Sequence, residues 1–256
     1  MTIERVNVLG VGLSALNLRT AVAAFADAIA HRRKGYVCVT GVHGVIEAQD
    51  DPEFRRILNQ AFLCTPDGMP MSWIGWLGGH RDMDRVYGPD LMLDVCARGE
   101  KEGWRHFFYG GAPGVAELLR DKLKEKFPAL QVVGTYTPPF RALTSEEESQ
   151  LQEQVRACRP DILWVGLSTP KQERFMAAYL ARLDATLMVG VGAAFDFHSG
   201  RVSQAPRWMQ RCGLEWFYRL CSEPRRLAKR YLKNNPRFLW KVFWQLTGVK
   251  KYSLET

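Results

Sequence analysis

The sequence has few of the features that mark secreted, metal-binding or membrane-spanning proteins. Its six cysteines form no Cys-x-x-Cys pair, which argues against a zinc site and a disulfide framework, so each is expected to be a small buried residue. No apolar run approaches the roughly 18 residues of a membrane-spanning helix, and no secretory signal pattern opens the chain. No His and Cys cluster has metal-ligand spacing. These absences predict a cytoplasmic protein without a metal site.

Charge is distributed unevenly along the 256 residues. The net charge is +8, and the hydrophobic fraction of 46% with 24% charged residues is that of a globular protein. Between Arg201 and Lys251 thirteen Lys and Arg face two Glu, so this stretch carries +11 and the remainder carries −3. The same part of the chain, extended by one residue to Tyr252, is rich in aromatic residues, which are Trp208, Trp216, Phe217, Tyr218, Tyr231, Phe238, Trp240, Phe243, Trp244 and Tyr252. A basic, aromatic tail predicts contact with an anionic partner, either lipid or nucleic acid.

Short apolar runs alternate with helical patterns up to about residue 200, which predicts an α/β fold with a parallel sheet. Thr144 and Glu147 form a capping-box pattern at the start of one predicted helix. After Gly200 the pattern predicts only helices, including one opened by Pro224 and another opened by Pro236. Residues 1–200 are therefore predicted to form a Rossmann-like α/β domain, and residues 201–256 a helical appendage.

Several polar groups are predicted at the edge of the sheet where the strands end, which is where such folds bind ligands. Asp67 follows an apolar strand in Thr65-Pro66-Asp67-Gly68 and is a candidate general base, although from this motif alone an Asp that only stabilises its own turn is the simpler expectation. Gly110 and Gly111 lie in a strand-to-helix turn that would let backbone N–H groups approach a phosphate, or would simply form a tight turn.

Other side chains permit two interpretations as well. Arg85 could hold a diphosphate or lie on the surface, and Gln172 could bind a sugar or cap its helix. Asp82-Met83-Asp84 is similar to a metal-binding Asp-x-Asp pair, but its arginine neighbours favour a solvated loop. His198 is an isolated histidine, for which a structural role is the simpler expectation.

Taken together, the ordered motifs resemble one family over nearly the whole chain, the WecG/TagA/CpsF glycosyltransferases of bacterial envelope and exopolysaccharide assembly. The motifs that carry the resemblance are Thr65-Pro66-Asp67-Gly68, Arg85-Val86-Tyr87-Gly88-Pro89-Asp90-Leu91, Phe108-Tyr109-Gly110-Gly111, Asp161 to Leu167 with Pro170-Lys171-Gln172-Glu173, Val191 to Asp196, Ala205-Pro206-Arg207-Trp208, Gly213-Leu214-Glu215-Trp216 and Glu223-Pro224-Arg225-Arg226.

The resemblance implies an inverting transfer, without an obligatory metal or other cofactor, from a UDP-sugar to a polyprenyl-diphosphate-linked saccharide at the cytoplasmic face of the membrane. It implies that Asp67 is the catalytic base and that Gly110 and Gly111 face the nucleotide. It further implies substrate contacts for Thr40, His43, Arg85, Asp90 and Gln172, and diphosphate or membrane contacts for Arg219, Arg226 and Arg230.

One motif departs from the family pattern. Where the family often has Thr-x-Asn, this chain has Thr40-Gly41-Val42-His43, so that His43 is the candidate for the missing polar contact. The variant resembles members that take part in exopolysaccharide synthesis. The donor is therefore open between an N-acetylmannosamine-type sugar and glucose or its relatives.

Two other functions fit parts of the sequence. A nucleotide-dependent oxidoreductase would use the Gly110-Gly111 turn, but the full Gly-x-Gly-x-x-Gly pattern is absent. A nucleic-acid-binding protein would use the basic tail, but it leaves Asp67, Arg85 and Gln172 unexplained. The glycosyltransferase interpretation predicts an anionic membrane surface as a partner and no nucleic acid. The tail aromatics would serve a homo-oligomer interface equally well.

Overall fold

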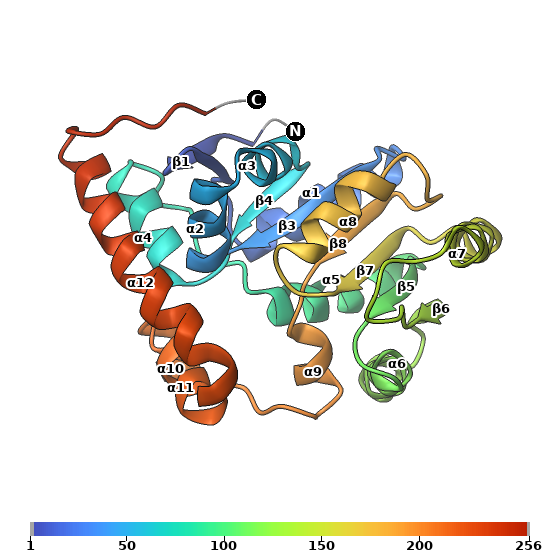
Figure 1. Cartoon of the computed structure of the whole chain (residues 1–256). Coiled ribbons are helices and arrows are strands. Elements are labelled where there is room, and N and C mark those ends of the chain that lie inside the picture. Colours follow the sequence, from blue (N-terminus) through green and yellow to red (C-terminus); the bar gives the residue numbers. More distant parts are fainter. Residues whose placement is uncertain (1–2, 255–256) are drawn as a thin grey trace. The chain divides into compact units, whose positions relative to one another are not determined.

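The chain folds into two compact units in the computed structural model, which describes residues 3–254 (Figure 1). Unit 1 comprises residues 19–38 and 88–203. Unit 2 comprises the other described residues, which are those up to Leu18, residues 39–87 and those from Gln204 onward. Strand β3 (Gly35–Thr40) begins in unit 1 and ends in unit 2. The helices of the predicted appendage therefore belong to the same unit as two segments from the first third of the chain.

A six-stranded sheet confirms the predicted α/β class. Its strand order is β4 (Leu63–Pro66), β3, β8 (Leu187–Gly190), β7 (Ile162–Gly166), β5 (Arg105–Gly110) and β6 (Gln131–Tyr136). From β3 to β6 every neighbouring pair is parallel. Phe107, Trp164 and Val189 in the middle strands are fully buried. Strands that are buried on both faces are continuous apolar runs, and this is why the sequence pattern located them.

The helices of unit 1 follow its strands in the predicted alternation. α6 packs against β5 and β6, α7 against β6, and α8 against β7 and β8. The helices are α1 (Leu18–Ala30), α5 (Gly88–Glu102), α6 (Val115–Lys126), α7 (Ser145–Cys158), α8 (Lys171–Tyr179) and α9 (Ala194–His198).

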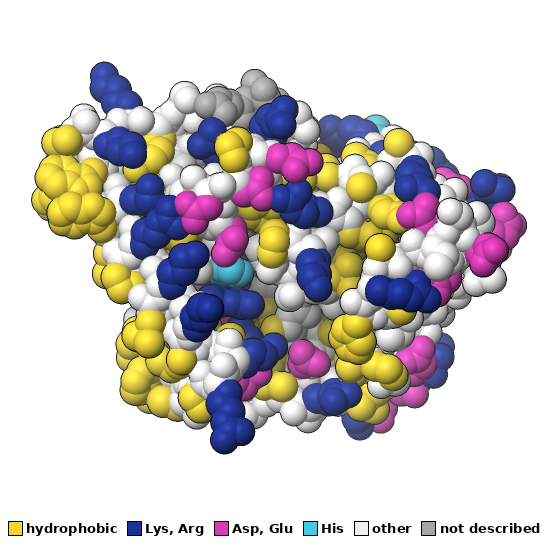
Figure 2. All heavy atoms as spheres, in the orientation of Figure 1, with side chains coloured by type: hydrophobic (Ala, Val, Ile, Leu, Met, Phe, Trp, Pro, Cys, Tyr) yellow, Lys and Arg dark blue, Asp and Glu magenta, His cyan; other side chains and the backbone are white. Residues whose placement is uncertain are grey.

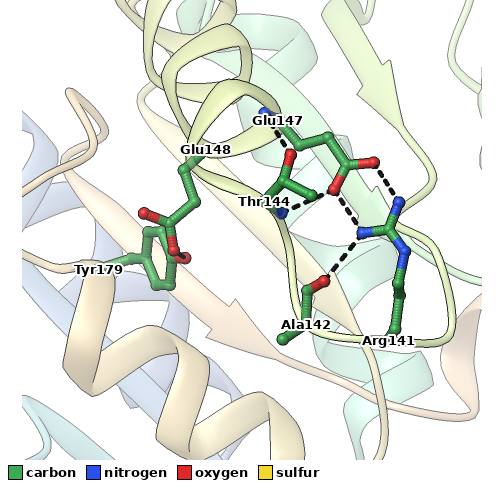
Figure 3. Close-up of polar contacts among 6 residues, drawn as sticks. All are labelled: Arg141, Ala142, Thr144, Glu147, Glu148 and Tyr179. Carbon is green, nitrogen blue, oxygen red and sulfur yellow. Dashed lines mark hydrogen bonds and ion pairs between the residues drawn. The ribbon is translucent and has the colours of Figure 1, made fainter.

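The predicted capping box at the start of α7 is present (Figure 3). The Glu147 backbone N–H donates to Thr144 Oγ1 over 3.3 Å, and the Thr144 N–H donates to the Glu147 carboxylate over 2.8 Å. Arg141 donates from both terminal nitrogens to the same carboxylate and lowers the pKa of Glu147 to about 2. Glu148 accepts from Tyr179 of α8, so the same turn also connects two helices.

Unit 2 is built on a hairpin and three consecutive helices that the sequence analysis did not predict. The turn of the hairpin has positive φ at both central residues, Leu9 (53°) and Gly10 (84°). Side chains from two helices hold it, because Gln49 donates to Leu9 O over 2.7 Å and Gln245 accepts from Leu9 N over 2.8 Å. The elements are β1 (Arg5–Val8), β2 (Val11–Ser14), α2 (Val42–Asp50), α3 (Pro52–Gln60), α4 (Met69–Leu77), α10 (Arg207–Arg211), α11 (Glu215–Ser222) and α12 (Pro224–Leu246).

The prediction that Pro236 opens a separate helix is wrong, because α12 is one helix of 23 residues with Pro236 inside it. A proline in a helix interior removes one hydrogen bond and costs about 3 kcal/mol. Here Asn234 and Phe238 are both buried, so burial continues across the proline. Pairing of α12 with α2 over this stretch offsets the local cost.

The apolar stripe of α12 is divided between the interior and the surface. Phe238 and Val242 are buried, whereas Leu239, Phe243 and Leu246 are more than half exposed. Figure 2 shows hydrophobic side chains gathered over the C-terminal half of this helix. Among residues 3–254, no helix combines the length and the apolar character needed to cross a bilayer.

The cysteine prediction holds for only part of the chain. Cys38, Cys64 and Cys96 are buried and Cys158 is half-buried, but Cys212 and Cys221 are exposed in the helical tail, so the expectation is wrong for these two and only partly met for Cys158. Cys212 directly follows α10, and Cys221 lies in α11, which has no buried residue.

Candidate active site

Asp67 lies directly after β4, at the C-terminal end of the strand. Its backbone N–H donates to Thr40 O over 2.9 Å, so the ends of β3 and β4 are held together. A Cβ on Gly41 would lie 2.8 Å from Asp67 O and 3.7 Å from Asp67 Oδ2. Only glycine therefore allows this approach. Gly41 is also the N-cap of α2, and negative charge beside a helix N-terminus is stabilised.

Thr40 is buried at the end of β3, next to this turn. Its backbone oxygen accepts from Asp67, and its hydroxyl oxygen accepts from the Cys64 thiol over 3.3 Å. In this structure Thr40 is a residue that positions Asp67. The sequence signal for the arrangement is the Thr-Gly pair at the end of a buried strand.

Arg85 is not a surface residue, since its side chain is only 10% exposed. Its guanidinium forms an ion pair with Glu215 of α11 and donates to Gln210 Oε1 over 3.2 Å. It also lies 3.9 Å from the centre of the Tyr87 ring. Burial, with the Glu215 and Asp67 carboxylates nearby, raises the pKa of Tyr87. Arg85 thus connects the Asp67 region to the helical tail.

The tail arginines lie close together around one carboxylate. Glu223 forms ion pairs with Arg226 and with Arg219, the latter at 3.8 Å. Burial lowers the pKa of Arg230, and the neighbouring Arg219 and Arg226 add to this effect. Two of the three arginines thus pair with Glu223, and the Glu47 carboxylate opposes the pKa shift of Arg230, so three cations are opposed by two carboxylates and the cluster keeps a net positive charge.

Tyr231 shows that this cluster lies close to Asp67. Burial raises its pKa, Arg219 and Arg230 oppose the shift, and the Glu215 and Asp67 carboxylates reinforce it. Asp67, Arg85 and the three tail arginines all belong to unit 2, and Asp67, Arg219 and Arg230 all act electrostatically on Tyr231. The sequence analysis did not select Tyr87, Gln210, Glu215, Glu223 or Tyr231 as site residues, although three of them lie in motifs that it quoted.

His43 occupies the first turn of α2. Its Nδ1 lies 2.9 Å from Asn234 Nδ2 of α12 and 3.6 Å from Glu47 Oε1. The amide of Asn234 is a donor, so Nδ1 accepts and the ring proton is on Nε2. The buried Asn234 thus sets the orientation of His43, a contact that spans 191 residues of sequence.

The Gly110-Gly111 turn belongs to unit 1. A Cβ on Gly110 would lie 2.7 Å from Gly166 O, so the two strand ends require glycine for packing alone. The Gly111 N–H donates to Gly166 O over 3.0 Å and is occupied by this bond. The geometry accounts for both glycines as a tight turn, and the role of this turn in nucleotide binding stays a prediction.

Gln172 is buried at the start of α8, also in unit 1. Its Nε2 donates to Glu173 Oε1 over 3.0 Å, and Thr169 donates to the same oxygen over 2.8 Å. The other end of the amide, Gln172 Oε1, has no hydrogen-bond partner among the residues described. Glu173 therefore holds the amide nitrogen of Gln172, and the amide oxygen of Gln172 remains available to accept a hydrogen bond. Sequence analysis did not predict this role for Glu173.

Glu173→Gln is expected to change how stability depends on pH. Burial raises the pKa of Glu173 above 4.5, so the folded state holds a proton that the unfolded chain releases. Stability is then lost as pH rises above about 4.5, by up to about 1.4 kcal/mol per pH unit. The variant, which carries no ionisable proton, should gain stability over wild type at pH 8 and lose this advantage towards pH 5 in urea unfolding. The exposed Glu153→Gln is the control, and equal pH profiles for the two variants would contradict the expectation.

The remaining predicted positions are structurally simple. Asp90 lies half-buried in the first turn of α5. His198 donates from Nε2 to Pro89 O over 2.9 Å, and burial lowers its pKa, as expected of a structural histidine. Asp82 and Asp84 are exposed, which fits the solvated-loop interpretation. Over the part of the chain that the structure describes, no three His, Cys, Asp or Glu side chains are grouped as metal ligands would be.

A parallel sheet that presents a carboxylate beside a group of arginines is typical of an α/β enzyme that acts on phosphorylated substrates. Residues 6–252 match the model of the glycosyl transferase WecG/TagA/CpsF family. The chain belongs to this family and is a glycosyltransferase, which decides against the oxidoreductase and nucleic-acid-binding alternatives as its principal function.

Two curated relatives carry the same name, N-acetylglucosaminyldiphosphoundecaprenol N-acetyl-beta-D-mannosaminyltransferase. The protein from Bacillus spizizenii (strain W23) is 30% identical over 196 residues, which is 76% of this chain and 74% of the relative. The protein from Bacillus subtilis (strain 168) is 29% identical over 174 residues, 68% of this chain and 66% of the relative.

Proposed function

We propose that this glycosyltransferase moves a sugar from a UDP-sugar onto a saccharide linked to a polyprenyl diphosphate, with inversion and without a metal, in envelope or exopolysaccharide synthesis. The observation that carries the proposal is the placement of Asp67 in one compact unit with the net-positive cluster of Arg219, Arg226 and Arg230. A general base and a group that stabilises a charged diphosphate are the two needs of this transfer.

In the proposed mechanism Asp67 accepts the proton of the acceptor hydroxyl. The hydroxyl oxygen then forms a bond to the anomeric carbon of the donor, and the bond from that carbon to the UDP oxygen breaks on the opposite face. The bonding electrons leave with UDP, whose negative charge the tail arginines stabilise. Gln172 Oε1, held open by Glu173, is proposed to accept from a substrate hydroxyl.

The name of the two relatives favours N-acetylmannosamine as the sugar and a diphosphoundecaprenol-linked N-acetylglucosamine as the acceptor. Glucose remains the second candidate donor because Val42-His43 departs from the family pattern. The chemistry of either donor is the same at Asp67, so the choice between them concerns the sugar pocket alone.

We propose further that unit 2 meets the cytoplasmic face of the membrane. Of the 16 large apolar side chains that are exposed in the described chain, 14 belong to unit 2. Figure 2 shows basic side chains near the hydrophobic ones on α12. Exposed aromatics beside Lys and Arg are typical of proteins that lie on anionic bilayers.

The test is release of UDP from a panel of UDP-sugars with a short-chain polyprenyl-diphosphate acceptor carrying N-acetylglucosamine or glucose. We expect release from one donor, only when acceptor is present, and unchanged by EDTA. The anomeric configuration of the product, read by NMR, decides inversion. Release that does not depend on the acceptor, or that stops with EDTA, would contradict the corresponding part of the proposal.

A further inference from the structure

A cavity of about 280 Å³ lies in unit 2, away from the cluster around Asp67. It is next to Gln49, near the C-terminal end of α2, whereas His43 is at the N-terminal end, about 9 Å further along the helix axis. Its lining includes four cations, Arg55, Lys241, Lys250 and Lys251, together with Gly10 and Tyr252. No role in the proposed transfer involves any of these residues.

The walls of this basic cavity come from three separate segments that are fixed to one another. Asn7 donates to Tyr252 O over 2.6 Å, and the Lys250 N–H donates to Trp244 O over 3.1 Å, so the segment after α12 is held against the hairpin. A Cβ on Gly10 would lie 3.3 Å from Ser253 O and 3.4 Å from Arg55 Cδ. The cations are therefore brought together by the fold and are not a random group of surface lysines.

Among residues 3–254, no carboxylate lines the basic cavity. The carboxylate of the nearby Asp50 accepts from both terminal nitrogens of Arg237. Neither of these two residues lines the cavity. Burial lowers the pKa of Lys241. The positive charges of Lys250 and Arg237 lower this pKa further, and the negative charge of Asp50 raises it. The Tyr252 hydroxyl is buried without a partner among the described residues. An anion would relieve the repulsion between Lys241 and Lys250.

Apolar side chains flank the cavity lysines. Trp240 precedes Lys241 and Val249 precedes Lys250, and these two apolar residues are 63% and 69% exposed. Trp240 forms an edge contact with Trp244, whose ring also contacts the half-exposed Phe243. A soluble phosphate would use the cations only, whereas the phosphate of a lipid would also place its chains against this apolar surface.

We propose that the basic cavity binds the phosphate of an anionic lipid headgroup, with the lipid chains against the aromatic side chains of α12. This rests on the proposed membrane association but adds a discrete site to it. Bound lipid would hold the end of α12 at the bilayer, while the same helix carries Arg226 and Arg230 towards the region of Asp67.

The test compares a soluble short-chain lipid, dihexanoylphosphatidylglycerol below its micelle concentration, with glycerophosphoglycerol, which has the same phosphodiester without acyl chains. Binding to the full chain is followed by tryptophan fluorescence and titration calorimetry. We expect saturable binding of one lipid per chain, at least about tenfold tighter than glycerophosphoglycerol. Equal affinities would show that the cavity binds a phosphate without recognising the lipid chains, which would overturn the assignment to a lipid. Absence of saturable lipid binding would overturn the site.

The variant Lys241→Gln/Lys250→Gln/Lys251→Gln should lose at least about tenfold in lipid affinity. The matched control, Arg225→Gln/Lys229→Gln/Lys233→Gln, removes three exposed cations of α12 that do not line the cavity and should change the lipid affinity less than about threefold. Equal losses would overturn the discrete site in favour of diffuse attraction.

UDP release with a water-soluble acceptor separates this inference from the proposed function. The cavity variant should retain wild-type turnover, because its residues lie outside the proposed catalytic machinery. If wild type binds the lipid but transfers no sugar, the proposed reaction fails and the lipid site stands. If the variant loses both turnover and the circular dichroism signal of its helices, it is misfolded. The single variant Lys251→Gln then takes its place.

Discussion

Asp67→Asn is expected to lower the turnover number for sugar transfer by about 10² to 10⁴, a barrier increase of about 3 to 5 kcal/mol. An amide cannot accept the proton of the acceptor hydroxyl, so the attacking oxygen stays a weak nucleophile. The substitution keeps size and hydrogen-bonding capacity, and the Asp67 backbone bond to Thr40 does not involve the side chain. KM for the donor should therefore change by less than about threefold.

Asp82→Asn is the matched control for this prediction. Asp82 is an exposed carboxylate of unit 2, and it belongs to the Asp-x-Asp pair that would matter if a metal were held there. Its loss should leave turnover within about twofold of wild type. A similar decrease in both variants, or a decrease of less than about fivefold in Asp67→Asn, would remove Asp67 from the role of base.

His106→Gln is expected to reduce the loss of stability on mild acidification. His106 is fully buried in β5, its Nδ1 accepts from Trp164 Nε1 over 3.0 Å, and burial lowers its pKa to about 3. The unfolded chain binds a proton near pH 6.5 and the folded chain does not, so stability falls as pH decreases from 6.5 towards 3. Between pH 6.5 and 5 this amounts to about 2 kcal/mol.

Urea unfolding at pH 7.5 and pH 5 measures the effect as a difference between the two conditions. Glutamine keeps an acceptor for Trp164 but has no proton to gain, so the variant should lose about 2 kcal/mol less than wild type on acidification, whatever its stability at pH 7.5. His31→Gln removes a histidine whose side chain is 68% exposed and should behave as wild type. Equal losses in wild type and His106→Gln would rule out His106 as the source.

The predicted sheet was correct because its strands are buried on both faces. Trp164 and its neighbours in β7 form a continuous apolar run, and this pattern needs no knowledge of the partner strand. The capping box of α7 was also predictable, because Thr144 and Glu147 interact within one helical turn. Both signals depend on residues close together in the chain, so they can be recognised from a single sequence.

The continuity of α12 and the elements of unit 2 were not predictable in this way. Pro236 is a local signal for a helix start, and burial of Asn234 and Phe238 against residues nearly 200 positions earlier overrides it. The β1–β2 hairpin likewise has Leu9 at positive φ, which no sequence rule favours, and side chains of Gln49 and Gln245 hold it.

The sequence by itself determined the class of the fold, the family, and the identity of the base candidate, because these depend on ordered motifs and on the period of apolar residues. Only the tertiary structure decided that Arg85 is buried against Glu215, that Gly41 admits the backbone of Asp67, and that four cations converge near Gly10. The reason is physical: each of these depends on a distance between residues far apart in the chain, and such distances are set by packing of the whole unit.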